Sequence, residues 1–273
     1  MLLERIELPS AATAPASVQA AEAERAGLAT VSLCKSFRGR IALHDLSLRV
    51  RSGEIVGLLG PDGAGKTTCF HLILGLRKPD SGRILLDGVD VTRMPTYRRA
   101  RLGLSYLPQE PCVFRGLTVE QNIRAVLELW EPDPARRDAR LEELLDEFRL
   151  GALRDRRATL LSGGERRRCE IVRALAGSPS IMLLDEPFAG IDPLTIAEIE
   201  ALIGRLKANG IGVLITDQNV HEMLHLVDRA YVIHEGHLVF EGPPKALATN
   251  ADVRRVYLGS DFDGPDDWRF GSG

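Results

Sequence analysis

Residues 57–68 read GLLGPDGAGKTT, in which Gly60, Gly65, Lys66 and Thr67 follow the pattern G-x-x-x-x-G-K-[ST]. An apolar run precedes the pattern and a helix-like run follows it, which predicts a strand, a loop and a helix. Glycines in such a loop let backbone N–H groups close around phosphate oxygens, and the following helix presents its positive end to them. The stretch therefore predicts a loop that binds the phosphates of ATP.

The residues of this loop are expected to contact the nucleotide in different ways. Lys66 would neutralise the β- and γ-phosphates, and Thr67 would offer its hydroxyl to Mg²⁺. Asp62 would repel phosphate, so we expect its carboxylate to point outward. The predicted nucleotide-binding residues of the loop are Gly60, Pro61, Asp62, Gly63, Ala64, Gly65, Lys66, Thr67 and Thr68.

The rest of the chain alternates strand-like and helix-like segments. EIVGLLG, SIMLLDE and GVLITD are short apolar runs, typical of strands buried on both faces, whereas ATVSLCKSF and IALHDLSLRV alternate as antiparallel strands do. This order predicts an α/β fold with a mainly parallel sheet, an antiparallel β-layer and a helical subdomain at about residues 111–160. We expect residues 29–258 to form the nucleotide-binding domain, between a mobile extension (1–28) and a C-terminal tail (259–273).

Composition excludes several classes of function. The chain has 273 residues, 44% of them hydrophobic, and can therefore bury a large core. A formal net charge of -3 argues against extended nucleic-acid binding. The four cysteines lack C-x-x-C spacing, which fits a reducing compartment, and no apolar run approaches the length of a membrane span. Any membrane role is therefore expected to depend on a partner.

Two carboxylates follow the apolar run 181–184. Asp185 is expected to hold Mg²⁺ through its water shell, and Glu186 to accept a proton from the attacking water or to orient it. Gln109, in the stretch YLPQE, is a neutral side chain able to touch both Mg²⁺ and water. The sequence thus predicts Glu186 and Gln109 as catalytic residues, and Thr67, Gln109 and Asp185 as metal ligands.

A second phosphate-binding helix start is expected in LLSGGERRR. Ser162, Gly163 and Gly164 open a helical stretch there, and the first turn of a helix has free N–H donors. Taken in order, GPDGAGKT, Gln109, LSGGE, LLDEP and the FAGID segment around Asp192 resemble the ATP-binding-cassette family over nearly all of residues 29–258.

This resemblance implies an ABC-type nucleotide-binding domain and a homodimer. LSGGE of one subunit would bind the γ-phosphate held by the loop of the other, with Asp192 at the same site, so that two ATP molecules are sandwiched. Phe37 would stack on adenine, although packing in the core is an equal alternative for this aromatic.

The segments PQEPCVFRGLTVEQN, DEPFAGIDP and VRRVYLGSDF are most similar to the ATPase subunits of bacterial lipopolysaccharide exporters. That resemblance implies a cytoplasmic ATPase, peripheral on the inner face of the inner membrane, that drives two membrane subunits. The ATPases of branched-chain amino acid importers share the layout and the YLG ending, and they remain the alternative.

A membrane partner is expected to dock beside Gln109. Cys112, Val113, Phe114 and Leu117 would line an apolar groove with Arg115 at its rim, unless they pack inside the helical subdomain. A basic run also precedes Gln109, and it would face lipid headgroups or the partner, although a solvated helix face explains it equally. The run consists of Arg93, Arg98, Arg99 and Arg101.

Residues 214–225, LITDQNVHEMLH, contain the zinc-hydrolase pattern H-E-x-x-H at His221 and His225. Against a zinc site, Asn219 and Glu222 have capping-box spacing, and no third ligand follows the pattern. We expect a helix whose buried stripe consists of Val220, Met223, Leu224 and Val227.

Gln218 stands where the resembled family has a histidine that contacts the γ-phosphate. We expect Gln218 to be catalytic but less effective than histidine. A further hypothesis is therefore a switch subunit that binds ATP and hydrolyses it slowly or not at all. The presence of Lys66, Asp185 and Glu186 argues instead for an enzyme.

Overall fold

The computed structural model describes residues 27–218 and 220–258. The tail predicted at 259–273 lies outside these residues, as does the predicted extension up to residue 26. Leu28 was placed in that extension, but it is buried and begins the first strand, where the Gly27 N–H donates to Asp87 Oδ1. Among the described residues, no helix is both long and apolar enough to cross a bilayer.

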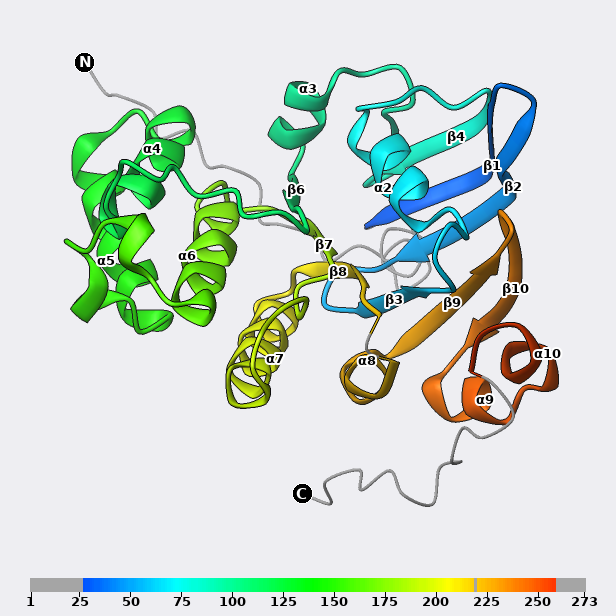
Figure 1. Cartoon of the computed structure of the whole chain (residues 1–273). Coiled ribbons are helices and arrows are strands. Elements are labelled where there is room, and N and C mark those ends of the chain that lie inside the picture. The colour runs from blue at the N-terminus through cyan, green and yellow to red at the C-terminus, as the bar shows by residue number, and fades with distance from the viewer. Residues whose placement is uncertain (1–26, 219, 259–273) are drawn as a thin grey trace, which may run out of the picture.

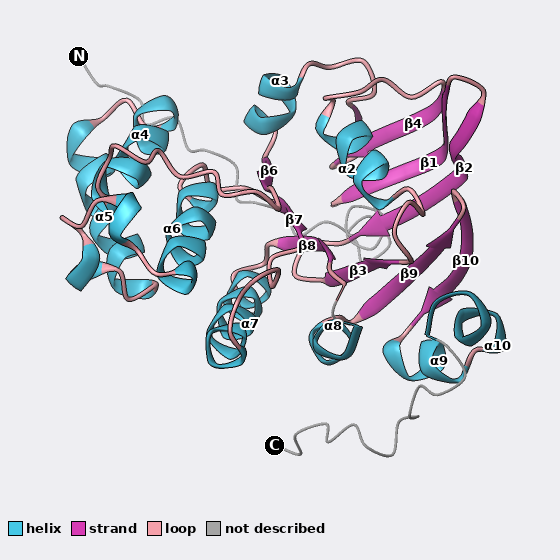
Figure 2. Cartoon of the chain, in the orientation of Figure 1, coloured by secondary structure: helices cyan, strands magenta, loops and turns pink. Residues whose placement is uncertain are grey.

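An antiparallel sheet of four strands forms the β-layer, in the order β2-β1-β4-β5. Figure 2 shows β2, β1 and β4 of this sheet side by side. Both alternating stretches predicted as antiparallel strands lie here and pair with each other, which confirms that prediction. Its strands are β1 (Leu28–Phe37), β2 (Arg40–Val50), β4 (Ser81–Leu86) and β5 (Val89–Asp90).

A six-stranded sheet forms the centre of the molecule, in the order β10-β9-β3-β8-β7-β6. All its pairings are parallel except that of β9 with β10. The three apolar runs predicted as fully buried strands are β3, β7 and β8, and each is buried along its whole length. The strands are β3 (Ile55–Leu59), β6 (Leu104–Leu107), β7 (Ile181–Asp185), β8 (Gly212–Thr216), β9 (Arg229–His234) and β10 (His237–Gly242).

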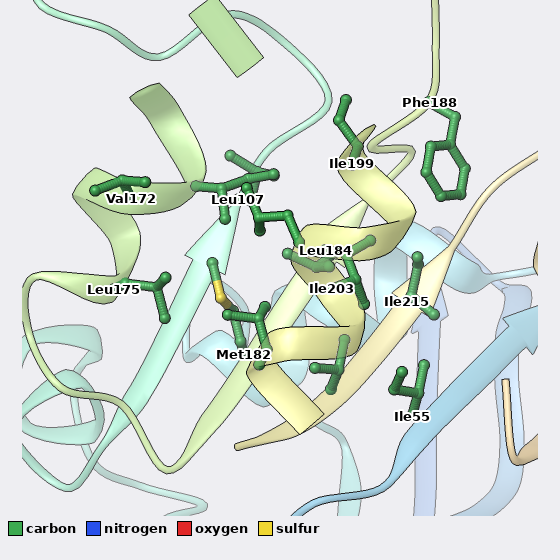
Figure 3. Packing of buried hydrophobic residues seen from close by; sticks show 14 of the residues in the cluster. Ile55, Leu107, Val172, Leu175, Met182, Leu184, Phe188, Ile199, Ile203 and Ile215 are labelled. Atoms are coloured by element: carbon green, nitrogen blue, oxygen red, sulfur yellow. The ribbon is translucent and has the colours of Figure 1, made fainter. Parts of the chain in front are cut away.

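Helices cover both faces of this sheet. Helix α2 (Lys66–Leu74) and the antiparallel sheet pack on one face, while α6 (Gly163–Leu175) and α7 (Pro193–Ala208) pack on the other. In Figure 3, Ile199 and Ile203 of α7 lie close to Leu184 of β7. The remaining elements are α3 (Thr96–Arg101), α8 (Val220–Leu226), α9 (Pro244–Thr249), α10 (Ala251–Val253), and the short turns η1 (Gly151–Leu153), η2 (Ala158–Leu160) and η3 (Arg254–Leu258).

A helical body stands beside the sheet, formed by α4 (Val119–Trp130), α5 (Pro134–Glu147) and α6 (Figure 1). Thr118 and Gln121 cap the start of α4 reciprocally, and Asp133 caps α5. Because α6 packs against α4, the body extends beyond the residue 160 predicted as its end.

The basic run before Gln109 does not form one surface. Arg99 is only 2% exposed and donates hydrogen bonds of 2.6–2.9 Å to the carbonyls of Leu72, Ile73, Thr92 and Met94. The expectation that it faces lipid or a partner is therefore wrong for Arg99, because the last carbonyls of α2 need donors. The other three arginines of the run are exposed.

Candidate functional site

Four adjacent parallel strands place the predicted site at one edge of the central sheet. The phosphate loop follows β3, Gln109 follows β6, Asp185 and Glu186 stand at the end of β7, and Gln218 follows β8. The carboxyl ends of parallel strands meet at one edge, which is where ligands bind in open α/β sheets.

The phosphate loop has the backbone that its glycines predict. Gly60 and Gly65 have φ values of 147° and 113°. A Cβ atom on Gly60 would lie 2.1 Å from Ile233 O, and one on Gly65 would lie 2.5 Å from Ala42 O. Both positions therefore require glycine for the conformation and for the close approach of other backbone. A hollow of about 170 Å³ opens beside the loop and is lined by Ala42, Asp62, Gly63, Gly65, Lys66, Thr67, Thr68 and Glu186.

Lys66 lies inside this loop and is 8% exposed. Its Nζ donates to Gly60 O at 2.6 Å and to Pro61 O at 3.1 Å. Burial lowers the pKa of Lys66, and nearby carboxylates, Asp62 first, oppose that shift. Asp62 itself is exposed but also lines the hollow, so the expectation that its carboxylate points away from the phosphates stays a prediction. The loop thus places the buried ammonium group of Lys66 in a hollow that is lined mainly by residues of the loop itself.

Glu186 stands between the two predicted glutamines. Gln109 Nε2 donates to Glu186 Oε2 at 2.6 Å, and Gln218 Nε2 donates to Glu186 Oε1 at 3.4 Å. Burial, and then the charge of Asp217, raise the pKa of Glu186. The residue has a positive φ of 44°, and its N–H donates to Thr216 O at 2.7 Å. The fold therefore brings the three predicted catalytic residues together, with both glutamines bonded to the carboxylate of Glu186.

Asp185 is 5% exposed at the end of β7. The hydroxyl of Tyr106, from the neighbouring strand β6, donates to Asp185 Oδ2 at 3.1 Å. Burial raises the pKa of this aspartate, and the Tyr106 hydrogen bond opposes the shift. Sequence reasoning missed Tyr106, although its place in YLPQE, near the end of a strand beside β7, was a usable signal.

Arg167 of α6 is a second site residue that sequence reasoning missed. It is 6% exposed and forms an ion pair with Glu170 at 3.2 Å. Its guanidinium also donates to the carbonyls of residues 185–187 and to Pro108 O. Arg167 thus fastens the turn that contains Glu186 to the residue before Gln109. In sequence it is one arginine of a run, so nothing distinguished it from Arg166 and Arg168, which are only half-buried.

The second predicted phosphate site lies at the start of α6. The Ser162 hydroxyl and the Glu165 carboxylate cap this helix reciprocally. Gly163 is exposed with open space around it, whereas a Cβ on Gly164 would lie 2.2 Å from Thr195 Cγ2. None of residues 162–164 lines the hollow at Lys66. Within one chain the two helix starts therefore do not share one hollow.

Asp192 and Phe37, the other two residues predicted to contact the nucleotide, are both exposed. Asp192 is exposed and caps α7, accepting from Thr195 N at 3.1 Å and from Thr195 Oγ1 at 2.7 Å. Phe37 is 41% exposed, with Lys35 Nζ 5.4 Å from its ring centroid. The alternative that Phe37 is a core residue is therefore wrong.

A groove of about 420 Å³ lies between α3, β6, α4 and the end of α6. Cys112 and Phe114 line it as predicted, together with Val126 and Trp130, and Phe114 is 52% exposed. Val113, which was expected in the same groove, packs instead against the buried core. The rim residue predicted at 115 and Leu117 are outside the lining of the groove. Tyr106 lines the groove while its hydroxyl holds Asp185, so this side chain connects the groove with the site.

The H-E-x-x-H pattern lies on the seven-residue helix α8. Of the predicted stripe, Met223, Leu224 and Val227 are buried, while Val220 is only half-buried against the core; His225 is exposed. The cap predicted at Asn219 and the side chain of His221 lie outside the described residues. Within residues 27–218 and 220–258, no group of three His, Cys, Asp or Glu side chains could hold a metal ion. The structure therefore offers no support for a zinc hydrolase.

Comparison with known proteins gives concordant results. The family model described as ABC transporter matches residues 43–189. A probable ABC transporter ATP-binding protein of Azorhizobium caulinodans is 59% identical over 86% of this chain and 84% of its own length. The lipopolysaccharide export system ATP-binding protein LptB of Escherichia coli K12 is 49% identical over 87% of this chain and 99% of its own length. LptB of Acidithiobacillus ferridurans is 54% identical over 85% of this chain and 96% of its own length.

Among solved structures, an ATP-binding cassette of an ABC transporter in its ADP conformation superposes with a TM-score of 0.77. It is 29% identical, and the match covers 85% of this chain and 98% of that chain. A nucleotide-free ATP-binding cassette from an ABC transporter superposes with a TM-score of 0.76 and is 28% identical. That match covers 85% of this chain and 99% of the other. The predicted fold class, with its parallel sheet, antiparallel sheet and helices, is confirmed.

Proposed function

The chain belongs to the ABC transporter family as an ATP-hydrolysing subunit, and we propose that it powers lipopolysaccharide export from the bacterial inner membrane. The observation that carries the proposal is its near-half identity with LptB over almost the whole LptB chain, together with the assembled ATP site. Branched-chain amino acid import and a zinc hydrolase are not favoured by these relatives.

ATP is held chiefly by the phosphate loop. The N–H groups of residues 62–68, which include the start of α2, surround the phosphates, and Lys66 contributes its positive charge between the β- and γ-phosphates. Phe37, exposed at the end of β1, stacks on the adenine. Asp62 lines the same hollow but is exposed, so solvent screens its charge from the phosphates.

The oxygen donors beside the loop suit Mg²⁺. Thr67 offers an exposed hydroxyl, Gln109 an amide oxygen, and Asp185 a buried carboxylate with one oxygen held by Tyr106. Such hard oxygen ligands are those that Mg²⁺ takes in nucleotide sites. When bound, the ion supplies positive charge to the β- and γ-phosphate oxygens.

Glu186 is the general base for hydrolysis. Its carboxylate accepts a proton from the attacking water, while Gln109 and Gln218 orient the carboxylate from either side. Gln218 is exposed and its hydrogen bond is long, so it also has freedom to donate to the γ-phosphate. Because Lys66, Asp185 and Glu186 are all in place, we favour an active enzyme over a switch that only binds ATP.

ABC ATPases dimerise, and two copies of this chain complete the site. Ser162, Gly163 and Gly164 of one subunit approach the phosphate loop of the other, with Asp192 nearby, so that two ATP molecules lie between them. The exposure of Gly163 and its separation from the hollow at Lys66 within one chain support this arrangement.

Membrane partners dock in the groove beside Gln109. A cytoplasmic helix of the partner inserts an apolar face against Cys112, Phe114 and Trp130, with Arg115 at the outer side. Tyr106 then carries the effect of docking to Asp185. The subunit thereby sits at the cytoplasmic face of the inner membrane and is attached to it through its partners.

Depletion of the protein in its bacterium tests the proposal. Newly made lipopolysaccharide should remain in the inner membrane, while uptake of labelled leucine continues. Wild-type protein supplied from a plasmid should restore export, whereas Glu186→Gln should not, because the carboxylate that activates water is lost. Loss of leucine uptake with normal lipopolysaccharide export would instead assign the chain to an importer.

A further inference from the structure

A second hollow, of about 520 Å³, lies between the β4–β5 edge and the start of α3. Three arginines line it: Arg83 from β4, Arg93 from the loop and Arg98 from α3. All three are exposed. We call it the arginine hollow. Its remaining lining residues are Gly82, Asp90, Thr92, Met94 and Pro95.

Within the described residues, no ion pair neutralises the arginines of the hollow. No carboxylate of the described residues forms an ion pair within 4.0 Å of Arg83, Arg93 or Arg98. Asp90 interacts with two of them only at longer range, and its Oδ1 accepts from Thr92 N at 2.9 Å. The lining thus holds three positive charges and one negative charge, although the whole chain has a net charge of -3.

Two arginines of the helical body, in contrast, have carboxylate partners. Arg124 pairs with Asp138 at 2.6 Å, and Arg154 pairs with Glu142 at 2.6 Å. Three guanidinium groups around one open space repel each other unless an anion lies among them. Guanidinium forks match the oxygens of a phosphate group, which can accept from several at once. The ligand chemistry of the hollow is therefore that of a phosphate.

The position of the hollow indicates where such phosphates come from. Thr96 and Ala100 of α3 line the groove of about 420 Å³ beside Gln109, in which we place the membrane partner. Arg98 of the same helix lines the arginine hollow. The two features thus lie on opposite sides of one helix, about 10 Å apart across its width. A membrane partner in the groove would therefore bring the hollow close to the headgroups, a placement that rests on the proposed function.

Exposed apolar side chains occur on α3 and β5, two of the elements that border the hollow. Tyr97 and Leu102, in and just after α3, are 58% and 40% exposed, and Val89 of β5 is 45% exposed. Aromatic and aliphatic groups next to arginines suit the headgroup region of a bilayer, where apolar bodies and charged tips are both accommodated.

We propose that the arginine hollow binds the phosphate groups of anionic phospholipids, and so holds this side of the subunit against the membrane. Binding is electrostatic and local, since three arginines act within one small surface of a chain that is acidic overall. It needs neither ATP nor the transporter partner, which makes it testable on the full chain alone.

The test is sedimentation of the full-length protein with vesicles of phosphatidylcholine, with and without phosphatidylglycerol, at low salt. The triple variant Arg83→Gln, Arg93→Gln, Arg98→Gln is compared with the control Arg136→Gln, Arg140→Gln, Arg255→Gln, which changes the net charge equally. Both sets lie on the surface. Wild type and control should bind the anionic vesicles, and the hollow variant about 10- to 100-fold more weakly.

Equal binding by the hollow variant and the wild type would overturn the proposal, as would equal binding to both kinds of vesicle. Arg98→Glu alone should reproduce the loss, and circular dichroism should show both variants folded. Inorganic phosphate is titrated separately. Its saturable binding at the hollow, without any preference for anionic vesicles, would assign the site to free phosphate and reject the lipid. Because the assay contains no partner, a negative result leaves the lipopolysaccharide phenotype of the depleted strain unaffected.

Discussion

Replacing Gln218 by histidine should speed hydrolysis without strengthening ATP binding. Gln218 Nε2 lies 3.4 Å from Glu186 Oε1, at the long end of hydrogen-bond geometry, whereas Gln109 Nε2 lies 2.6 Å from the other oxygen. A glutamine amide is neutral, while an imidazole can take a positive charge as negative charge develops on the transferred phosphate. A histidine at position 218 should therefore stabilise the transition state of hydrolysis more than the glutamine does.

The size of the gain follows from the difference between the two kinds of hydrogen bond. A neutral hydrogen bond contributes about 0.5–1.5 kcal/mol and one to a charged group about 1.5–3 kcal/mol. A difference of about 1–2 kcal/mol in the barrier corresponds to roughly a five- to thirtyfold rise in kcat. ATP affinity should change by only about twofold, because Lys66 and the loop amides dominate phosphate binding.

The assay is phosphate release over a range of ATP concentrations, which separates kcat from KM. It should be run well above the pKa of Glu186, which burial and Asp217 raise, because a carboxylate base loses activity as the pH falls through its pKa. Gln218→Ala is the matched control and should lower kcat. An unchanged or lower kcat in Gln218→His would refute the reasoning, since Gln218 would then not be a weakened contact to the phosphate.

Three further results are expected. Glu186→Gln should trap an ATP-bound dimer, seen by light scattering as twice the 29.9 kDa mass of one chain, and a strict monomer with ATP and partners present would count against the shared site. Phe114→Ala should weaken capture of the membrane partners about tenfold while ATP affinity stays constant, whereas Leu129→Ala, at a residue 79% exposed on α4, should change neither. Equal losses of partner capture and ATP affinity for Phe114→Ala would show that this side chain supports the fold and does not specifically bind the partner. Tyr106→Phe removes the hydrogen bond to Asp185, so half-maximal activity should require about five- to tenfold more Mg²⁺, and an unchanged requirement would show that the tyrosine does not position that carboxylate.

Local patterns were sufficient for the fold. The glycines and Lys66 of residues 57–68 are adjacent in sequence, and a phosphate loop uses backbone that those residues themselves fix. Runs buried on both faces identified β3, β7 and β8, because a central parallel strand has no polar face. The order of motifs then indicated which strand ends would bear Gln109, Glu186 and Gln218.

The tertiary structure decided which side chains meet. Tyr106 reaches Asp185, 79 positions away, only because β6 pairs with β7, and that register is set by long-range pairs such as Leu104 with Ile181. Arg99 and Arg93 stand in one basic run, yet one satisfies carbonyls at the end of a buried helix and the other faces an open hollow. Val113 turned to the core while Phe114 stayed exposed. Charge and hydropathy are properties of single residues, whereas burial and hydrogen-bond partners depend on distant segments. The sequence by itself therefore determined the elements and the chemistry of the loop, and packing alone decided the partners of each side chain.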